Sequence, residues 1–225
     1  MKIVPIAHFK SPFSSKFGIP KQSGMVSELK GQIIFTPPYR NVDYIRGLEH
    51  FDYLWLIWEF SANPHSSNSP LVRPPLLGGN ETKGIFATRS PFRPNPLGLS
   101  SVKIDKIELS STIGPVIHVL GGDLMNDTPI YDIKPYIEYA DSHTNIRNGF
   151  VDHHSVRQLK VDFPLSLRKY FSQEQCKAII GTLSFDPRPR YQCDKTRRYG
   201  MPMFGYDIRF LVDDEHLTIV DVVKI

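Results

Sequence analysis

The sequence predicts a mainly β protein in which a small antiparallel β-barrel precedes a smaller α+β C-terminal domain. Short apolar runs follow one another with turn residues between them, and they do not alternate with helices as in βαβ proteins. Helical periodicity is confined to a few segments. Most of the 19 prolines fall within residues 64–96 and 187–202. These stretches favour rigid connections, because proline fixes φ and lacks a backbone donor.

Eight apolar runs have the length of strands and are bounded by turn residues. They cover residues 3–9, 32–35, 53–60, 84–88, 97–109, 116–121, 204–212 and 216–223. The last two flank Asp213, Asp214 and Glu215, which favour a hairpin turn. Short strands joined in this way are typical of barrels and sandwiches.

Three segments favour helices. Residues 42–51 follow Asn41, an N-cap residue type, and repeat apolar residues on one face. Residues 173–185 follow Ser172, which forms a Ser-x-x-Gln capping box with Gln175. Residues 165–171 favour a third, shorter helix.

The sequence predicts a domain boundary near residues 141–152, where residues 141–149 are polar and loop-like. A barrel domain, residues 1–145, precedes it, and a C-terminal domain, residues 146–225, follows. Charge is distributed unevenly across this boundary. Residues 1–144 carry 14 Lys/Arg and 13 Asp/Glu, whereas residues 145–210 carry 12 and 6. A basic C-terminal part suits contact with a phosphate backbone.

Several classes of protein are disfavoured. No apolar run approaches the roughly 20 residues of a membrane span, and the first residues lack the apolar region of a signal peptide, so we expect a cytoplasmic protein without membrane contact. Cys176 and Cys193 form no C-x-x-C pair, and the adjacent His153 and His154 lack a third ligand at metal spacing, so we expect no metal. Dinucleotide-binding, P-loop and G-x-S-x-G motifs are missing.

The first candidate site is residues 88–98, TRSPFRPNPLG. Three prolines stiffen this segment, and Arg89 and Arg93 supply planar cationic forks that bind a carboxylate or phosphate bidentately. Asn95 adds an amide, and Gly98 permits close approach of the backbone. The alternative is a rigid crossover with surface arginines.

The second candidate site begins with the polar turn at residues 123–128. A short alternating strand follows, in which Asp132, Lys134 and Tyr136 have the same parity and therefore share one face. A carboxylate, an ammonium and a phenol together are able to position an amine and accept its proton. A half-exposed strand with a paired Asp and Lys is the alternative.

The third candidate site is a basic stretch in the C-terminal domain. Its cationic residues are Arg188, Arg190, Lys195, Arg197 and Arg198. Tyr191 and Tyr199 lie among them, and this mixture suits RNA, because guanidinium groups meet phosphates while phenol rings stack on unpaired bases. An ordinary solvated surface is the alternative.

Together these segments resemble the TsaA-like family, whose characterised bacterial members are called TrmO. The resemblance is carried, in family order, by residues 45–49 (IRGLE), 72–75 (VRPP), 77–80 (LGGN), 87–98 (ATRSPFRPNPLG), 132–136 (DIKPY) and 186–189 (DPRP). The resemblance implies a β-barrel that binds S-adenosylmethionine without a Rossmann domain, as a homodimer with the cofactor near the subunit interface. It also implies N6-methylation of threonylcarbamoyladenosine at position 37, beside the anticodon of a threonine tRNA.

The cofactor contacts of the family map onto five segments of this chain. They are Pro20, Lys21, Gln22, Ser61, Ala62, Arg89, Leu99, Asp123, Leu124, Met125, Asn126 and Thr128. The chain departs from the family pattern at two places. The family has His-Gln where this chain has Ser61-Ala62, and Asp-Gly where it has Asn126-Asp127.

In the implied reaction, proton acceptance is assigned to Asp132, with Tyr136 and Asn95 orienting the base and Lys134 tuning the carboxylate. Arg89 is expected to hold the cofactor, and Arg93 either the cofactor or tRNA. Three other readings stay open. They are a non-catalytic RNA-binding barrel, a methyltransferase for a different acceptor, and a hydrolase of modified nucleotides using Asp132 and His118.

Overall fold

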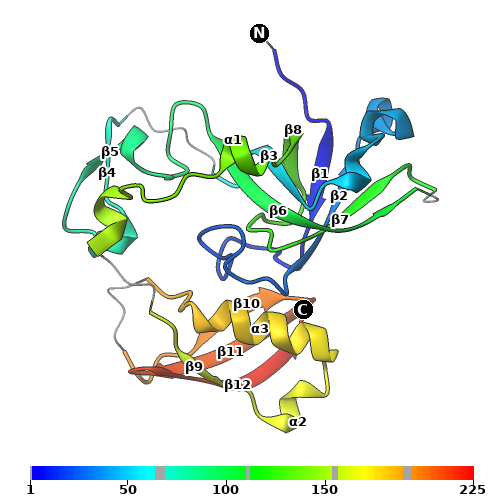
Figure 1. The fold of residues 1–225 in the computed structure, drawn as a ribbon. Coiled ribbons are helices and arrows are strands. Elements are labelled where there is room, and N and C mark those ends of the chain that lie inside the picture. The colour runs from blue at the N-terminus through cyan, green and yellow to red at the C-terminus, as the bar shows by residue number, and fades with distance from the viewer. Residues whose placement is uncertain (1, 64–68, 110–111, 154–156, 190–193) are drawn as a thin grey trace.

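A computed structural model describes residues 2–63, 69–109, 112–153, 157–189 and 194–225 (Figure 1). The predicted mainly β character is confirmed. Six antiparallel strands close into a barrel in the order β1-β2-β7-β6-β3-β8. They are β1 Ala7–Lys10, β2 Lys30–Phe35, β3 Tyr53–Glu59, β6 Leu97–Glu108, β7 Val116–Leu120 and β8 Thr128–Pro135.

The barrel interior is filled by alternate residues of its strands. On β3, Leu54, Leu56 and Trp58 point inward and are buried. Opposite Trp58 on β6 stands Gly98, where a Cβ atom would lie 2.3 Å from the Trp58 ring. Glycine is therefore required there by the packing of the indole, because overlap at that distance forces a neighbour to move.

A second, four-stranded sheet carries the C-terminal part and lies below the barrel in Figure 1. Its order is β10-β11-β12-β9, with β9 parallel to β12. The strands are β9 Lys160–Asp162, β10 Tyr199–Met203, β11 Tyr206–Asp213 and β12 His216–Lys224. The helix α3 Gln173–Ser184 lies against this sheet and begins with the predicted Ser172 and Gln175 capping box.

The loop between β1 and β2 belongs to the core of this second sheet. Phe13, Val26 and Leu29 are buried in the same apolar cluster as α3 and the C-terminal strands. At Gly18, whose φ is 92°, an added Cβ would lie 2.4 Å from the Met201 sulfur. The N-terminal loop and the C-terminal sheet therefore stabilise each other.

Several predicted elements differ in the structure. The predicted strand at residues 84–88 is wrong, because β5 Lys83–Gly84 pairs with β4 Leu71–Val72 and is followed by the 3-10 turn η5 Ile85–Ala87. The predicted helix at residues 42–51 is two 3-10 turns, η2 Val42–Ile45 and η3 Leu48–His50. Gly47, with a φ of 88°, separates them.

Other differences concern element ends. The predicted Asn41 cap is confirmed by its side chain, which accepts from the Asp43 N–H. The helix predicted over residues 165–171 is limited to α2 Leu165–Arg168. The sequence does not predict the edge strand β10, because Gly200 and Pro202 interrupt its apolar pattern.

The remaining short helices are η1 Pro37–Tyr39, η4 Pro75–Leu77, α1 Glu138–Asp141 and η6 Gly149–His153. In the described parts of the chain, no helix combines the length and apolar character needed to cross a membrane.

Candidate functional site

A large cleft of about 2260 Å³ opens between the barrel and the C-terminal sheet. Its lining comes from the β1–β2 loop, the end of β3, the segments around β4 and β5, the proline-rich segment, the turn after β7 and the C-terminal part. Nine of the lining residues are Lys or Arg and four are Asp or Glu. This excess favours anionic ligands.

Ten of the twelve residues predicted to contact a cofactor line this cleft. They are Pro20, Lys21, Gln22, Ser61, Ala62, Arg89, Leu99, Asp123, Met125 and Thr128. The other two lie outside the lining. Leu124 is fully buried in the barrel core, and the Asn126 side chain turns toward β1, where its Oδ1 accepts from the Ser11 N–H.

Both arginines of the proline-rich segment line the cleft, in different settings. The Arg89 guanidinium donates to the Gln22 side chain, so it joins this segment to the β1–β2 loop. The Arg93 Nη1 donates to the Thr88 carbonyl at 3.0 Å and to the Ser90 carbonyl at 3.4 Å. Arg93 therefore stabilises the fold of its own segment, while Arg89 faces an exposed part of the cleft.

A chain of hydrogen bonds leads from the barrel interior to the cleft. The Trp58 Nε1–H donates to Ser100 Oγ at 2.9 Å, and the Ser100 hydroxyl donates to Asp123 Oδ1 at 2.6 Å. Burial raises the pKa of the Asp123 carboxyl, and the Ser100 hydrogen bond opposes that rise. Trp58 and Ser100 are not predicted as site residues from the sequence, because inward residues of a barrel strand normally belong to the apolar core.

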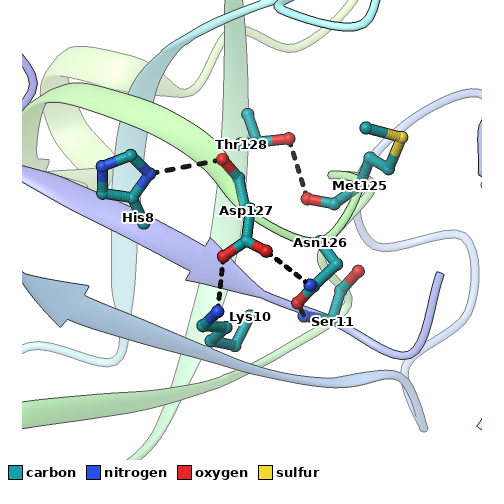
Figure 2. Close-up of polar contacts among 7 residues, drawn as sticks. All are labelled: His8, Lys10, Ser11, Met125, Asn126, Asp127 and Thr128. Carbon is teal, nitrogen blue, oxygen red and sulfur yellow. Dashed lines mark hydrogen bonds and ion pairs between the residues drawn. The ribbon is translucent and has the colours of Figure 1, made fainter. Parts of the chain in front are cut away.

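Polar contacts join the turn after β7 to residues at the end of β1 (Figure 2). The Asp127 carboxylate forms an ion pair with Lys10 and accepts from the Asn126 amide at 2.9 Å, and the Thr128 hydroxyl donates to the Met125 carbonyl at 2.7 Å. Asp127 has a φ of 62°, a left-handed conformation that favours glycine. The conformation at position 127 would therefore suit the glycine that the resemblance implies there.

Replacement of Asp127 by glycine should therefore change the free energy of unfolding little, by less than about 0.5 kcal/mol. Relief of the left-handed conformation offsets loss of the exposed Lys10 ion pair. Asp127→Val should instead lower stability by about 1–2 kcal/mol, because a β-branched side chain is strained at this φ. Urea denaturation of both variants measures the difference, and equal midpoints for the two would contradict the explanation.

The second predicted group lies on the outer face of β8. Asp132 forms a 2.9 Å ion pair with Lys134, and its Oδ1 accepts from the Ile133 N–H at 2.9 Å. The Tyr136 ring lies 5.7 Å from the Trp55 ring. None of Asp132, Lys134 and Tyr136 lines the cleft, and neither does Asn95. Asp132 is nevertheless paired with Ile57 on β3. On its other side, Ile57 is paired with the cleft residue Leu99 of β6.

A bulge in β8 next to Asp132 directs Tyr131 toward the cleft residue Glu59. The phenol donates to the Glu59 carboxylate, and this hydrogen bond, with some burial, raises the pKa of Tyr131 to about 12. Tyr131 therefore stays protonated at neutral pH.

The geometry does not support a hydrolase that uses Asp132 together with His118, because the two residues lie on strands that are not paired. His118 lies on β7, which pairs with β2 and β6, whereas Asp132 lies on β8, which pairs with β1 and β3. The His118 Nε2 is instead 3.2 Å from the Glu108 carboxylate.

Two of the predicted RNA-contacting residues have acidic partners within the chain. Arg188 donates to both oxygens of Asp186 at 2.8 and 3.0 Å, and its side chain is only 11% exposed. Lys195 pairs with Asp213 and Asp214. Arg197 lies over the Tyr199 ring at 5.4 Å, and Arg198 is exposed. Arg190 lies outside the described residues.

Other cleft residues are not among the predicted site residues, although Arg73 lies in a segment that carries the resemblance. Arg73, Lys83 and Arg157 add positive charge, and Phe86 is 80% exposed at the lining. Exposure of so large an apolar ring would have been hard to anticipate, because residues 84–88 read as a strand. Within the described ranges, no group of three His, Cys, Asp or Glu residues could hold a metal ion.

Comparison with known proteins identifies the family. The family model described as the tRNA-methyltransferase O N-terminal domain matches residues 8–142, and the TrmO C-terminal domain matches residues 156–225. The chain is 35% identical over 219 residues to the tRNA (adenine(37)-N6)-methyltransferase of Escherichia coli K12, covering 93% of this chain and 92% of that protein.

Two further relatives agree. A putative S-adenosylmethionine-dependent methyltransferase RcsF of Pseudomonas aeruginosa is 34% identical, over 92% of this chain and 91% of that one. A crystal structure of TrmO from P. aeruginosa superposes with a TM-score of 0.80 at 28% identity, covering 100% of this chain and 97% of that one. The chain therefore belongs to the tRNA-methyltransferase O (TrmO) family.

Proposed function

We propose that this chain is an S-adenosylmethionine-dependent methyltransferase that modifies N6 of adenine 37 in tRNA. We further propose that the acceptor is threonylcarbamoyladenosine in a threonine tRNA. The observation that carries the proposal is the cleft, where ten family cofactor positions from separate segments meet in a positively charged lining. The names of the full-length relatives supply the reaction.

The cleft fits the chemistry of the cofactor, which joins an amino acid, a sulfonium and an adenosine. Arg89 offers a cation for the carboxylate, and Asp123 offers a half-buried anion for the cationic part. Phe60 and Leu99 offer apolar contact for the adenosine. When bound, the cofactor supplies the methyl group.

The protein contributes mainly by alignment, which is worth about 7–11 kcal/mol in well-oriented reactions. The acceptor nitrogen must also lose its proton. We propose Asp132 for this role. Asp132 on β8 and the cleft residue Leu99 on β6 lie on the same outer face of the barrel, on either side of Ile57 on β3. Lys134 forms an ion pair with this carboxylate, while Tyr136 and Asn95 orient the base.

Asp132→Asn should leave the dissociation constant for S-adenosylmethionine unchanged and lower turnover by about 100-fold or more. Asp105→Asn, a carboxylate on β6 outside the cleft lining, is the matched control and should behave as wild type. Single-turnover methylation at saturating tRNA measures the effect. Wild-type turnover in Asp132→Asn would remove Asp132 from the mechanism.

We also propose a cytoplasmic homodimer. The outer face near the cleft exposes Tyr53, Leu97 and Leu99, which are 44%, 37% and 57% exposed. A second subunit placed on this face would cover these apolar side chains and bring another surface toward Asp132.

The exposed basic residues should bind the tRNA backbone. Combined Arg197→Ala and Arg198→Ala should weaken tRNA binding and reduce the slope of log K against log salt by roughly 1 for each lost phosphate contact. Lys106→Ala, an exposed lysine of β6 outside the cleft lining, is the control. Filter binding at 50–200 mM salt measures both quantities, and an unchanged slope would exclude these two arginines from the interface.

Calorimetry separates this function from a non-catalytic RNA-binding barrel. The proposed enzyme binds S-adenosylmethionine without tRNA, whereas an RNA-binding barrel binds tRNA only. A methyltransfer assay with tRNA that has or lacks the threonylcarbamoyl group identifies the acceptor. Equal methylation of both tRNAs would overturn the finer substrate assignment.

A further inference from the structure

One line of polar groups crosses the apolar barrel interior from β3 through β6 to the cleft. Trp58 and Ser100 are only 7% and 1% exposed, yet both carry polar groups. Their distances, 2.9 Å from Trp58 to Ser100 and 2.6 Å from Ser100 to Asp123, satisfy each of these groups. Buried polar groups in an apolar core are costly unless they are paired, so the arrangement specifies one geometry.

The indole that begins this line is held in place by its neighbours. Trp58 packs over the backbone of Gly98, where even a methyl group would overlap the ring, and its ring contacts Phe60 with a centroid separation of 4.4 Å. Because the Trp58 N–H can only donate, the Ser100 oxygen acts as its acceptor. The Ser100 proton is consequently directed to Asp123.

Asp123 is the end of the line and is the half-buried carboxylate of the cleft. Its surroundings shift the pKa of this carboxyl in opposite directions. Burial raises the pKa of Asp123, whereas the Ser100 hydroxyl and the backbone N–H groups of Ser23 and Asp123 itself lower it. Among the described charged groups, Arg89 is the one that acts on this carboxyl electrostatically, also lowering its pKa.

We infer that Trp58 and Ser100 are positioning residues that hold Asp123 as the anionic contact for the cationic part of S-adenosylmethionine. This inference rests on the proposed function. Without the donated hydrogen bond, a half-buried carboxyl would take up a proton more readily and lose the charge that attracts the cation. Arg89, on the same cleft, then meets the carboxylate end of the cofactor. The two ends of an amino acid are thereby matched by opposite charges.

Calorimetric titration of S-adenosylmethionine into the full-length protein between pH 5 and 8 tests the inference. Wild-type affinity should fall as the pH drops through the pKa of Asp123, because the protonated carboxyl no longer attracts a cation. Ser100→Ala should raise the midpoint of that fall and weaken binding by about tenfold near pH 6. Trp58→Phe, which keeps a ring but lacks the N–H, should move the midpoint in the same direction by less.

Asp123→Asn should weaken binding about tenfold or more near pH 8 and remove the pH dependence. Ser101→Ala is the matched control, since Ser101 is the next residue on β6, points to the outer face and lies outside the cleft lining. Thermal unfolding of each variant verifies that it is folded. S-adenosylhomocysteine, which lacks the sulfonium charge, locates the contact. An equal loss for both ligands assigns Asp123 to the amino group, and a loss for S-adenosylmethionine alone assigns it to the sulfonium.

Two results would overturn the inference. One is wild-type affinity in Asp123→Asn. The other is a folded Ser100→Ala protein whose binding is weakened equally at every pH, which would indicate a packing role alone. A failure of the proposed function is distinguishable, because the wild-type protein would then show no binding of S-adenosylmethionine at all.

Discussion

Removal of residues 146–225 is expected to abolish both stable folding and S-adenosylmethionine binding. Phe13, Val26 and Leu29 of the β1–β2 loop are buried in the C-terminal core. Their exposure would forfeit about 1.5–3 kcal/mol for each side chain, a large share of the 5–15 kcal/mol by which domains are usually stable. The same loop carries Pro20, Lys21 and Gln22 to the cleft, so the proposed cofactor contacts would lose their support.

Circular dichroism during heating and calorimetry with S-adenosylmethionine check this prediction. Phe13→Ala in the full-length chain isolates the loop contribution. It should lower the free energy of unfolding by about 3–5 kcal/mol and weaken cofactor binding. A truncated protein, residues 1–145, that melts cooperatively and binds the cofactor like the full chain would show that the C-terminal sheet does not support the loop.

Gly98→Ala should destabilise the protein by about 1–3 kcal/mol or more, although it adds only one methyl group. Its Cβ would lie 2.3 Å from the Trp58 ring, which must then move. Movement of the indole breaks its hydrogen bond to Ser100, so S-adenosylmethionine binding should weaken as well. Both effects arise within the motif that carries the family resemblance.

Gly84→Ala is the control for Gly98→Ala. An added Cβ at Gly84 has no neighbour within 4 Å, and its φ of −58° suits any residue. It should change the unfolding midpoint little. Urea denaturation of the two variants compares them directly, and equal stability would show that the Trp58 packing tolerates a side chain at position 98.

The sequence predicts those parts of the fold that depend on local patterns. Alternating apolar residues identify β3, and the capping box identifies α3, because both signals lie within a few residues. The prediction of a helix at residues 42–51 is wrong, because Gly47 adopts a left-handed conformation that apolar periodicity does not reveal. Burial of Phe13 in the C-terminal core is also hidden, since the contact joins distant segments.

The site residues also fall into those that local motifs indicate and those that only the fold brings together. The family motif indicates Arg89 and the polar turn, which the fold brings to one cleft. Ser100 is missed, because its partners Trp58 and Asp123 are distant in sequence and meet only in the closed barrel. In the basic stretch, by contrast, the sequence predicts an RNA contact for a residue that has partners within the chain. The sequence predicts that Lys195 contacts phosphate, but in the fold Lys195 forms ion pairs with Asp213 and Asp214 at the end of β11.

Mass spectrometry of tRNA nucleosides from a strain lacking this gene shows whether the protein carries out the proposed methylation in the cell. We expect the N6-methylated form of threonylcarbamoyladenosine to disappear and the unmethylated nucleoside to accumulate. The intact gene should restore methylation, whereas an Arg89→Ala variant should not. An unchanged level of the methylated nucleoside in the deletion strain would contradict the proposed reaction.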